Sequence, residues 1–259
     1  MPTDTPGWWP IHITTDADSK FIFVAFNRPS LLLVFAINAD GTLGGEVKQN
    51  EPPETGIFPH QIRITPDNKM AILVTRGNDA TKDKAEDPGA LKVFHYNNGQ
   101  LSGEVSIAPN KGYGFGPRHL DFHTEKPWVY VSLERQNQLT VYKRDGDALQ
   151  SSAAWTVNTV QKPGKSGLRQ MVGTVHVHPN GRFVYVANQG TELEPADTVS
   201  VIDVSTNSVI DTIRTGSGAH GVTVSNDGRL VFVTNIIEST VTAIDVELRS
   251  VVATFAVGK

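Results

Sequence analysis

The sequence predicts an all-β protein, a β-propeller built from five four-stranded blades. Three observations predict this fold. One phrase of alternating apolar residues and polar turns recurs five times, its period is close to 50 residues, and no segment reads as a long amphipathic helix. Several strands per repeat of this length are typical of propeller blades. We expect residues 1–259 to form one domain, with blades at about 8–50, 56–109, 114–160, 168–216 and 217–259.

Each repeat begins with a hairpin whose second strand is rich in β-branched and aromatic residues. In chain order, these second strands are Phe21–Val24, Met70–Val74, Trp128–Val131, Phe183–Val186 and Leu230–Val233. The last turn residue before each strand gives a common origin for counting, at Lys20, Lys69, Pro127, Arg182 and Arg229. Successive origins lie 49, 58, 55 and 47 residues apart, which is the regularity that predicts repeated blades.

A third strand follows each hairpin, and a looser fourth strand completes the repeat. The third strands are expected at Ser30–Ile37, Leu91–Tyr96, Gln138–Lys143, Thr198–Asp203 and Ser239–Asp245. The fourth is clearest in the last two repeats, at Val209–Arg214 and Val251–Val257. Charged or proline-containing insertions at Gly77–Gly89 and Thr191–Asp197 predict loops. A β-sandwich is the alternative all-β fold, and the in-phase return of one turn phrase favours the propeller.

Composition and charge argue against several classes of protein. The net charge is −4 and no basic stripe is present, so we expect no nucleic-acid partner. The chain has no cysteine, which excludes disulfides, thiol nucleophiles and cysteine zinc sites. Neither a signal-peptide pattern nor an apolar run of ~18 residues is visible, so a cytoplasmic protein with no membrane partner is expected. No cofactor or metal is expected; His176 and His178 lack a suitably spaced carboxylate and are assigned structural roles.

Propeller geometry predicts where a ligand would bind. The first strand of a blade lines the channel and the second runs back, so the start of one and the end of the other reach the same funnel mouth. Nine residues before the origins lie Ile11, His60, Arg118, Gly173 and His220, and seven residues after them lie Asn27, Arg76, Glu134, Gln189 and Ile236. Most of these are polar, and His119 is one residue along, so we expect a binding site there. Each residue alone could equally satisfy loop backbone groups or line a water-filled channel.

Two phrases carry a family resemblance. Gly116–His123 followed by Val129–Glu134 resembles the signature of the seven-bladed propeller lactonases, which include bacterial 6-phosphogluconolactonases and fungal carboxy-muconate lactonizing enzymes. Phe58-Pro59-His60 and His178–Gly190 extend the resemblance, whereas Val231–Asn235 looks more like the YVTN repeats of surface proteins. The family has seven blades, and five repeats are visible in this sequence.

The resemblance implies lactone chemistry at the funnel. By motif, the family's catalytic His, Arg and Glu fall on His60, Arg118 and Glu134. Arg118 would stabilise the oxyanion, while His60 or Glu134 activates water and the other returns a proton to the leaving alkoxide. The same groups could also close a lactone on an unsaturated acid.

Substrate contacts are expected from Arg76, His119, Gln189 and His220. The family's second Arg belongs to a phrase that here ends in Gln189-Gly190, so Arg76 would have to supply the charge for an anionic substrate. The expected partner is a small-molecule lactone or organic acid. Two non-enzymatic alternatives stay open: a YVTN-type propeller that binds a ligand or protein, and a scaffold that uses its outer blade edges.

Overall fold

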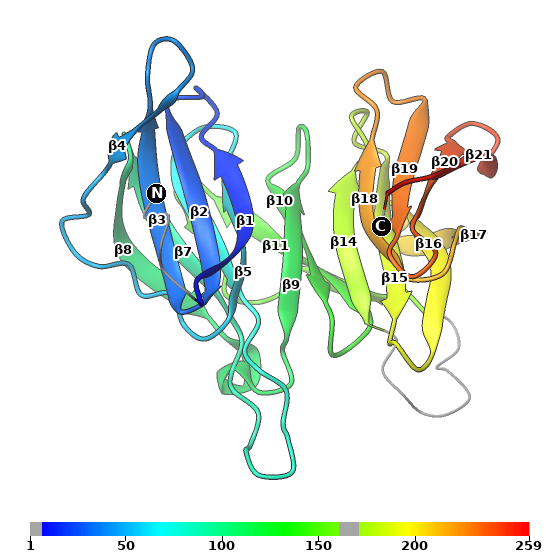
Figure 1. Cartoon of the computed structure of the whole chain (residues 1–259), viewed down its shortest axis with the longest axis horizontal. Coiled ribbons are helices and arrows are strands. Elements are labelled where there is room, and N and C mark those ends of the chain that lie inside the picture. The colour runs from blue at the N-terminus through cyan, green and yellow to red at the C-terminus, as the bar shows by residue number, and fades with distance from the viewer. Residues whose placement is uncertain (1–6, 161–170, 259) are drawn as a thin grey trace. The chain divides into compact units, whose positions relative to one another are not determined.

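The computed structural model of the chain describes residues 7–160 and 171–258 (Figure 1). The chain divides into two compact units, Met1–Arg118 with Arg144–Ser151, and His119–Lys143 with Ser152–Lys259. Each unit is described by itself. Among the described residues, no helix has the length and hydropathy required to cross a lipid bilayer.

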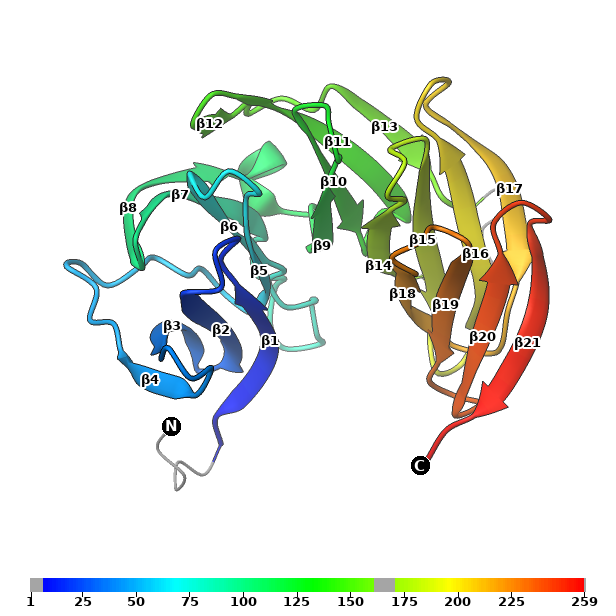
Figure 2. The same cartoon turned by 90° about the horizontal axis from the view of Figure 1, so that it is seen from above.

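The strands form five antiparallel sheets, and within each sheet they lie largely in chain order (Figures 1 and 2). The first unit holds two of these sheets. One consists of β1 (Trp9–Thr15), β2 (Phe21–Arg28), β3 (Ser30–Ile37) and β4 (Leu43–Glu46). The other consists of β5 (Pro59–Ile64), β6 (Met70–Thr75), β7 (Ala90–Asn97) and β8 (Gln100–Ile107). The second unit also holds two sheets. One consists of β14 (Val172–Val177), β15 (Phe183–Gly190), β16 (Pro195–Asp203) and β17 (Ser208–Arg214). The other consists of β18 (Ala219–Val224), β19 (Leu230–Asn235), β20 (Thr240–Asp245) and β21 (Ser250–Ala256). The prediction of an all-β chain with five repeated sheets is confirmed.

The remaining sheet is shared between the units. It comprises β9 (Pro117–Phe122), β10 (Trp128–Leu133), β11 (Gln138–Asp145), β12 (Ala148–Leu149) and β13 (Trp155–Asn158). The β11–β12 hairpin from Arg144 onward belongs to the first unit, whereas β10 and β13 belong to the second. The sequence did not predict this hairpin, nor the short 3-10 helix at Pro109–Gly112.

All five predicted second strands begin at the predicted residue, and the insertion Gly77–Gly89 contains no strand. The loop predicted at Thr191–Asp197 is wrong in its last three residues, because β16 begins at Pro195. A tight connection explains the difference. The amide of Thr191 donates to the carbonyl of Glu194 at 3.0 Å, and Pro195 then pairs with Gly190. Proline at the first residue of a strand leaves the rest of the hydrogen-bond ladder intact.

The core lies between consecutive sheets and is made by alternate residues of facing strands. In the first unit, Phe23 and Leu32 of one sheet pack with Ile62, Leu73 and Phe94 of the next. The sheets β14–β17 and β18–β21 of the second unit repeat this arrangement. A side chain points to the same face every second residue along a strand, which is why the apolar alternation of the sequence becomes a stack of sheets.

A side chain four residues before each origin caps the hairpin turn between the first two strands. It accepts a hydrogen bond from one or two backbone amides of the turn or following strand. The five capping residues are Asp16, Thr65, His123, His178 and Ser225. Such caps satisfy turn amides that the strands leave unpaired.

The two capping histidines also bond to the following sheet. Nδ1 of each ring accepts backbone amides, so Nε2 carries the proton and donates. Nε2 of His123 lies 3.0 Å from the carbonyl oxygen of Gly181, and Nε2 of His178 lies 2.8 Å from that of Gly228. Asp16 does the same in the first unit, where its carboxylate accepts the Tyr96 hydroxyl at 3.1 Å. In three of the five repeats, the capping side chain therefore both closes its turn and bonds to the following sheet.

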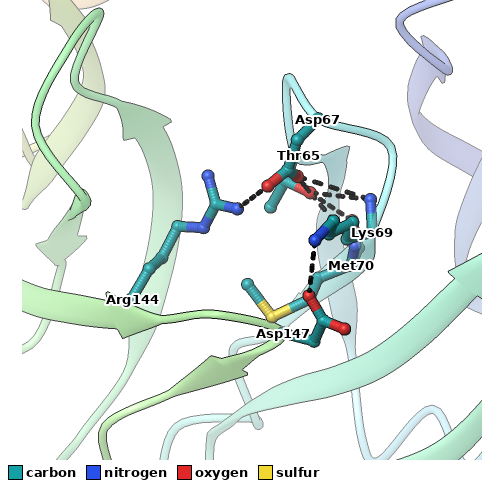
Figure 3. Close-up of polar contacts among 6 residues, drawn as sticks. All are labelled: Thr65, Asp67, Lys69, Met70, Arg144 and Asp147. Atoms are coloured by element: carbon teal, nitrogen blue, oxygen red, sulfur yellow. Dashed lines mark hydrogen bonds and ion pairs between the residues drawn. The ribbon is translucent and has the colours of Figure 1, made fainter.

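Charged pairs attach the β11–β12 hairpin to the turn between β5 and β6 (Figure 3). Arg144 forms an ion pair with Asp67, which also accepts the Thr65 hydroxyl at 2.6 Å. Beside it, Nζ of Lys69 lies 3.3 Å from the Asp147 carboxylate. These pairs join residues more than 70 positions apart and connect the hairpin to another sheet of the first unit.

Candidate functional site

Three of the predicted site residues lie in the first unit, at the strand ends that the count assigned to them. His60 is second in β5, Arg76 directly follows β6, and Arg118 is second in β9. His60 and Arg118 are 8% and 7% exposed, and the Arg76 side chain is 11% exposed. Arginine side chains are rarely buried to this extent. Two such arginines at strand ends are therefore more than a strand needs in order to join a loop.

Phe58 links His60 with Arg76. Its ring stacks on the His60 imidazole, with centroids 6.5 Å apart and planes inclined by 28°. The Arg76 guanidinium carbon lies 5.5 Å from the centre of the Phe58 ring, and the Arg76 amide donates to the Phe58 carbonyl at 2.9 Å. Phe58 holds a φ of 61°, which is an uncommon backbone conformation for an aromatic residue. Phe58 lies two residues before His60 in the sequence, which does not indicate this role.

The charge of Arg76 is compensated within its own loop. Its Nη2 lies 2.7 Å from the Asp79 carboxylate, and Nη1 donates to the carbonyl of Gly77 at 3.2 Å. Asp79 is not among the predicted residues, because the insertion that contains it has no counterpart in the other repeats. An anionic substrate group would therefore have to compete with Asp79 for Arg76.

The other four predicted residues lie in the second unit. His119 is third in β9, Glu134 directly follows β10, Gln189 is last but one in β15, and His220 is second in β18. Glu134 is 1% exposed and His119 8%, whereas Gln189 and His220 are half-buried. A carboxylate is kept this deep only with polar surroundings, because burying an ionised group away from water is costly.

Ser132 connects the starts of β9 and β14. It is fully buried, and its hydroxyl accepts the amide of His119 at 3.2 Å and donates to the carbonyl of Gly173 at 2.9 Å. Ser132 is not among the predicted site residues. The signal was a hydroxyl at the same position of the last repeat, where Thr234 accepts the amide of Gly221 at 2.8 Å.

Gly173 permits a close approach of the next sheet. A Cβ at this position would lie 2.6 Å from the carbonyl oxygen of His220. Gly173 stands where the other repeats place His60, Arg118 and His220. The same position of the first strand therefore carries a polar side chain in three sheets, whereas in a fourth sheet a glycine there lets two backbones pack closely.

The structure links four of the seven predicted residues, in two separate groups, and does not establish how Arg118, Glu134 and Gln189 lie relative to them. His60 and Arg76 share the Phe58 ring in the first unit, and in the second unit Ser132 and Gly173 join the backbones of His119 and His220. The convergence of both groups on one funnel mouth stays a prediction. A histidine, an arginine and a carboxylate suffice for general acid–base chemistry with stabilisation of an oxyanion.

Among residues 7–160 and 171–258, no group of three histidine, aspartate or glutamate side chains is arranged to hold a metal ion. His178 is a turn cap. A carboxylate does lie near His176, since its Nδ1 is 3.8 Å from Asp121, although Asp121 already accepts the amide of Val177 at 2.8 Å. The sequence spacing gave no indication of Asp121 because it comes from a different sheet strand, β9.

Comparison with known proteins supplies a family and several relatives. Residues 3–258 match the family described as lactonase, seven-bladed β-propeller. The 6-phosphogluconolactonase of Bacillus subtilis (strain 168) is 30% identical over 200 residues, which are 76% of this chain and 53% of that protein. The 6-phosphogluconolactonase of Pectobacterium carotovorum (strain PC1) is 27% identical over 71% of this chain and 51% of its own. The chain thus spans about half the length of these curated relatives.

Solved structures share the fold. The periplasmic gluconolactonase of Pseudomonas aeruginosa superimposes with a TM-score of 0.71 at 21% identity, covering 96% of this chain and 70% of that one. The hydrazine synthase of Kuenenia stuttgartiensis gives a TM-score of 0.65 at 15% identity, covering 95% and 65%. Proteins with such different names share this architecture, so the likeness carries the fold alone.

Proposed function

The chain belongs to the seven-bladed β-propeller lactonase family, and from this premise we propose that it hydrolyses a sugar or carboxylic-acid lactone with His60, Arg118 and Glu134. One observation supports the proposal most. Three groups of complementary chemistry, an imidazole, a guanidinium and a carboxylate, are 8%, 7% and 1% exposed at the strand ends that the family's motifs match. Such groups are costly to bury, and a few polar groups gathered at strand ends are typical of ligand sites.

The proposed reaction adds water to the lactone carbonyl and breaks the ring C–O bond to give a hydroxy acid. Arg118 donates hydrogen bonds to the carbonyl oxygen as negative charge develops on it. Glu134 or His60 takes the proton of the attacking water, and the other returns a proton to the leaving alkoxide. Stacking on Phe58 restricts rotation of the His60 ring and so favours one orientation of its nitrogens.

The charge distribution favours a neutral lactone over a phosphorylated one. Gln189 stands where the family signature has an arginine, and Arg76 is bonded to Asp79 at 2.7 Å. An arginine recognises a phosphate through its permanent positive charge, and here the Asp79 carboxylate competes with the phosphate for that charge. Gluconolactone is therefore the first substrate we would offer, ahead of 6-phosphogluconolactone.

Replacing Glu134 by glutamine should abolish most of the turnover. The amide keeps the shape of the side chain but cannot take or return a proton, so we expect a drop in kcat of about 10²-fold or more. The measurement is a pH-indicator assay on gluconolactone, 6-phosphogluconolactone and a muconolactone. Glu125→Gln removes an exposed carboxylate from the same sheet's turn and should leave turnover unchanged.

Equal turnover in Glu134→Gln and the wild type, with circular dichroism showing both folded, would reject Glu134 as the acid or base. Absence of hydrolysis on every lactone would favour a second candidate, a propeller that binds a ligand without converting it. The loss of the family arginine at Gln189 is the observation in favour of that candidate. Ring closure of an unsaturated acid, without hydrolysis, would instead assign a lactonizing isomerase.

A further inference from the structure

A pocket lies in the second unit, at the strand ends opposite to Glu134 and His220. It has a volume of about 440 Å³ and opens between the sheets β14–β17 and β18–β21. Three arginines line it, each from a different turn: Arg182 before β15, Arg229 before β19 and Arg249 before β21. The proposed lactone chemistry uses none of them.

The guanidinium groups of the three arginines are not held in ion pairs with described residues. No ion pair or guanidinium hydrogen bond joins Arg182, Arg229 or Arg249 to another described residue, although Arg182 and Arg229 interact electrostatically with Asp203 and Asp227. Two acidic residues, Asp245 and Glu247, also line the pocket, but Asp245 accepts the amide of Leu248 at 2.8 Å and so caps its own turn. The lining side chains keep one net positive charge on a chain whose net charge is −4.

Phe183 orients two of the guanidinium groups. The Arg182 and Arg249 guanidinium carbons lie 5.3 Å and 5.6 Å from the centre of its ring. A guanidinium group that stacks on an aromatic face is held in position while its N–H groups still point outward as donors. Planar pairs of such donors match the oxygens of carboxylates and phosphates.

The equivalent pocket between the preceding pair of sheets is much smaller, so the repeat alone does not produce a pocket of this size. The corresponding pocket between the β9–β13 and β14–β17 sheets has a volume of only about 120 Å³. Where the large pocket has Glu247 and Arg249, the preceding sheet has Ser205 and Asn207. Arg249 has a φ of 50° and Asn207 a φ of 54°, a left-handed conformation that asparagine accepts more readily than arginine. The cationic side chain therefore occupies a backbone position for which its residue type is poorly suited.

We propose that this pocket binds a small multivalent oxyanion, a polyphosphate or a tricarboxylate, through the guanidinium groups of Arg182, Arg229 and Arg249. Three donors from three turns can surround an anion that a single surface arginine would hold only weakly. Within the second unit, the pocket and Glu134 lie at opposite ends of the strands, so the proposed anion is distinct from the lactone substrate.

Isothermal titration calorimetry with inorganic pyrophosphate, and separately with citrate, tests the proposal at low ionic strength. We expect saturable binding of one anion per chain. Arg249→Gln and Arg182→Gln should each weaken it by about tenfold or more, because each removes charge-assisted hydrogen bonds. Glu247→Gln removes a repelling charge and should strengthen binding. Saturation by pyrophosphate alone would assign a phosphate site, and saturation by both a general oxyanion site.

Arg214→Gln is the matched control, because this arginine of the same unit is 82% exposed and lies 2.8 Å from Asp197. It should bind pyrophosphate as the wild type does. Equal weakening by Arg214→Gln and Arg249→Gln would reduce the effect to net charge and overturn the proposal, as would the absence of saturable heat in the folded wild type. Lactone turnover should be unchanged in Arg249→Gln, so failure of this site and failure of the lactonase proposal give different results.

Discussion

Gly173 illustrates at the scale of a single residue how a missing side chain shapes the candidate site. Replacing it by alanine would bring a Cβ to 2.6 Å from the carbonyl oxygen of His220, so the backbone of β14 or β18 would have to shift. We expect Gly173→Ala to lower the free energy of unfolding by ~1–3 kcal/mol, measured by urea unfolding. Gly45→Ala is the control, since a Cβ there meets nothing within 4 Å. Equal midpoints for both variants would show that the sheets absorb the methyl group.

His12 in β1 should make the fold sensitive to acid. Burial, and then the charge of Arg63, lower its pKa to about 4. Its Nδ1 is buried and has no hydrogen-bond partner among the described residues. Because the pKa in the folded chain lies below the unfolded value of ~6.5, the stabilisation by neutral His12 is complete above that pH and is lost as pH falls toward 4.

The loss should reach at most ~1.4 kcal/mol per pH unit within that window. His12→Gln does not titrate, so it should lose less stability than the wild type between pH 7.5 and pH 5. Urea unfolding at the two pH values measures the difference. Identical losses in the two proteins would show that His12 keeps an ordinary pKa.

The site residues themselves divide into those that counting could reach and those that it could not. Glu134 and Arg118 could be assigned because propeller strands alternate and the repeat has a fixed origin. Phe58 and Asp79 could not, since a left-handed φ and a loop contact depend on packing that no periodicity encodes. Ser132 lay within reach, because Thr234 repeats its hydroxyl.

At the scale of the hairpin, the histidine caps make a pH-dependent contact between sheets. Burial lowers the pKa of His123, so its ring stays neutral and Nδ1 remains an acceptor. As pH falls below ~6.5, the unfolded chain takes up this proton first, and the stabilisation by neutral His123 is lost as pH falls through the lowered pKa. Protonation removes the acceptor that caps the turn.

His123→Asn places an amide oxygen near the position of Nδ1 but cannot titrate. We expect the variant to lose ~1 kcal/mol at pH 7.5, because the bond to Gly181 is gone, and to lose less than the wild type between pH 7.5 and pH 5.5. Chemical denaturation at both pH values checks this. His95→Asn, at an exposed position, should follow the wild type. A variant as acid-sensitive as the wild type would argue against the cap.

Strands proved easier to predict than their connections. Turn chemistry and alternation placed the start of every second strand, because both are local properties of the chain. The early start of β16 at Pro195 and the short β12 depend on pairing with Gly190 and Arg144, respectively. Such pairing is a tertiary property, so no local pattern announced it.

At the scale of the whole molecule, the period of the sequence predicted five sheets but not the division into two units. The β11–β12 hairpin belongs to the first unit, where Arg144 and Asp147 pair with Asp67 and Lys69 of another repeat. Single charges of this kind have no periodicity from which to infer them. The expectation that residues 1–259 act as one domain stays a prediction.

The capping histidines have a consequence for how disturbances travel along the second unit. Each cap reaches forward, from the turn of one sheet to the backbone of the next, through Gly181 and Gly228. The cooperativity of unfolding then depends on the contacts between sheets as well as on the sheets themselves. In linear repeat proteins, likewise, the stability is the sum of the repeat stabilities and the interactions between neighbouring repeats. Opening one hairpin removes a hydrogen bond from its successor, so consecutive sheets should lose amide protection as pairs.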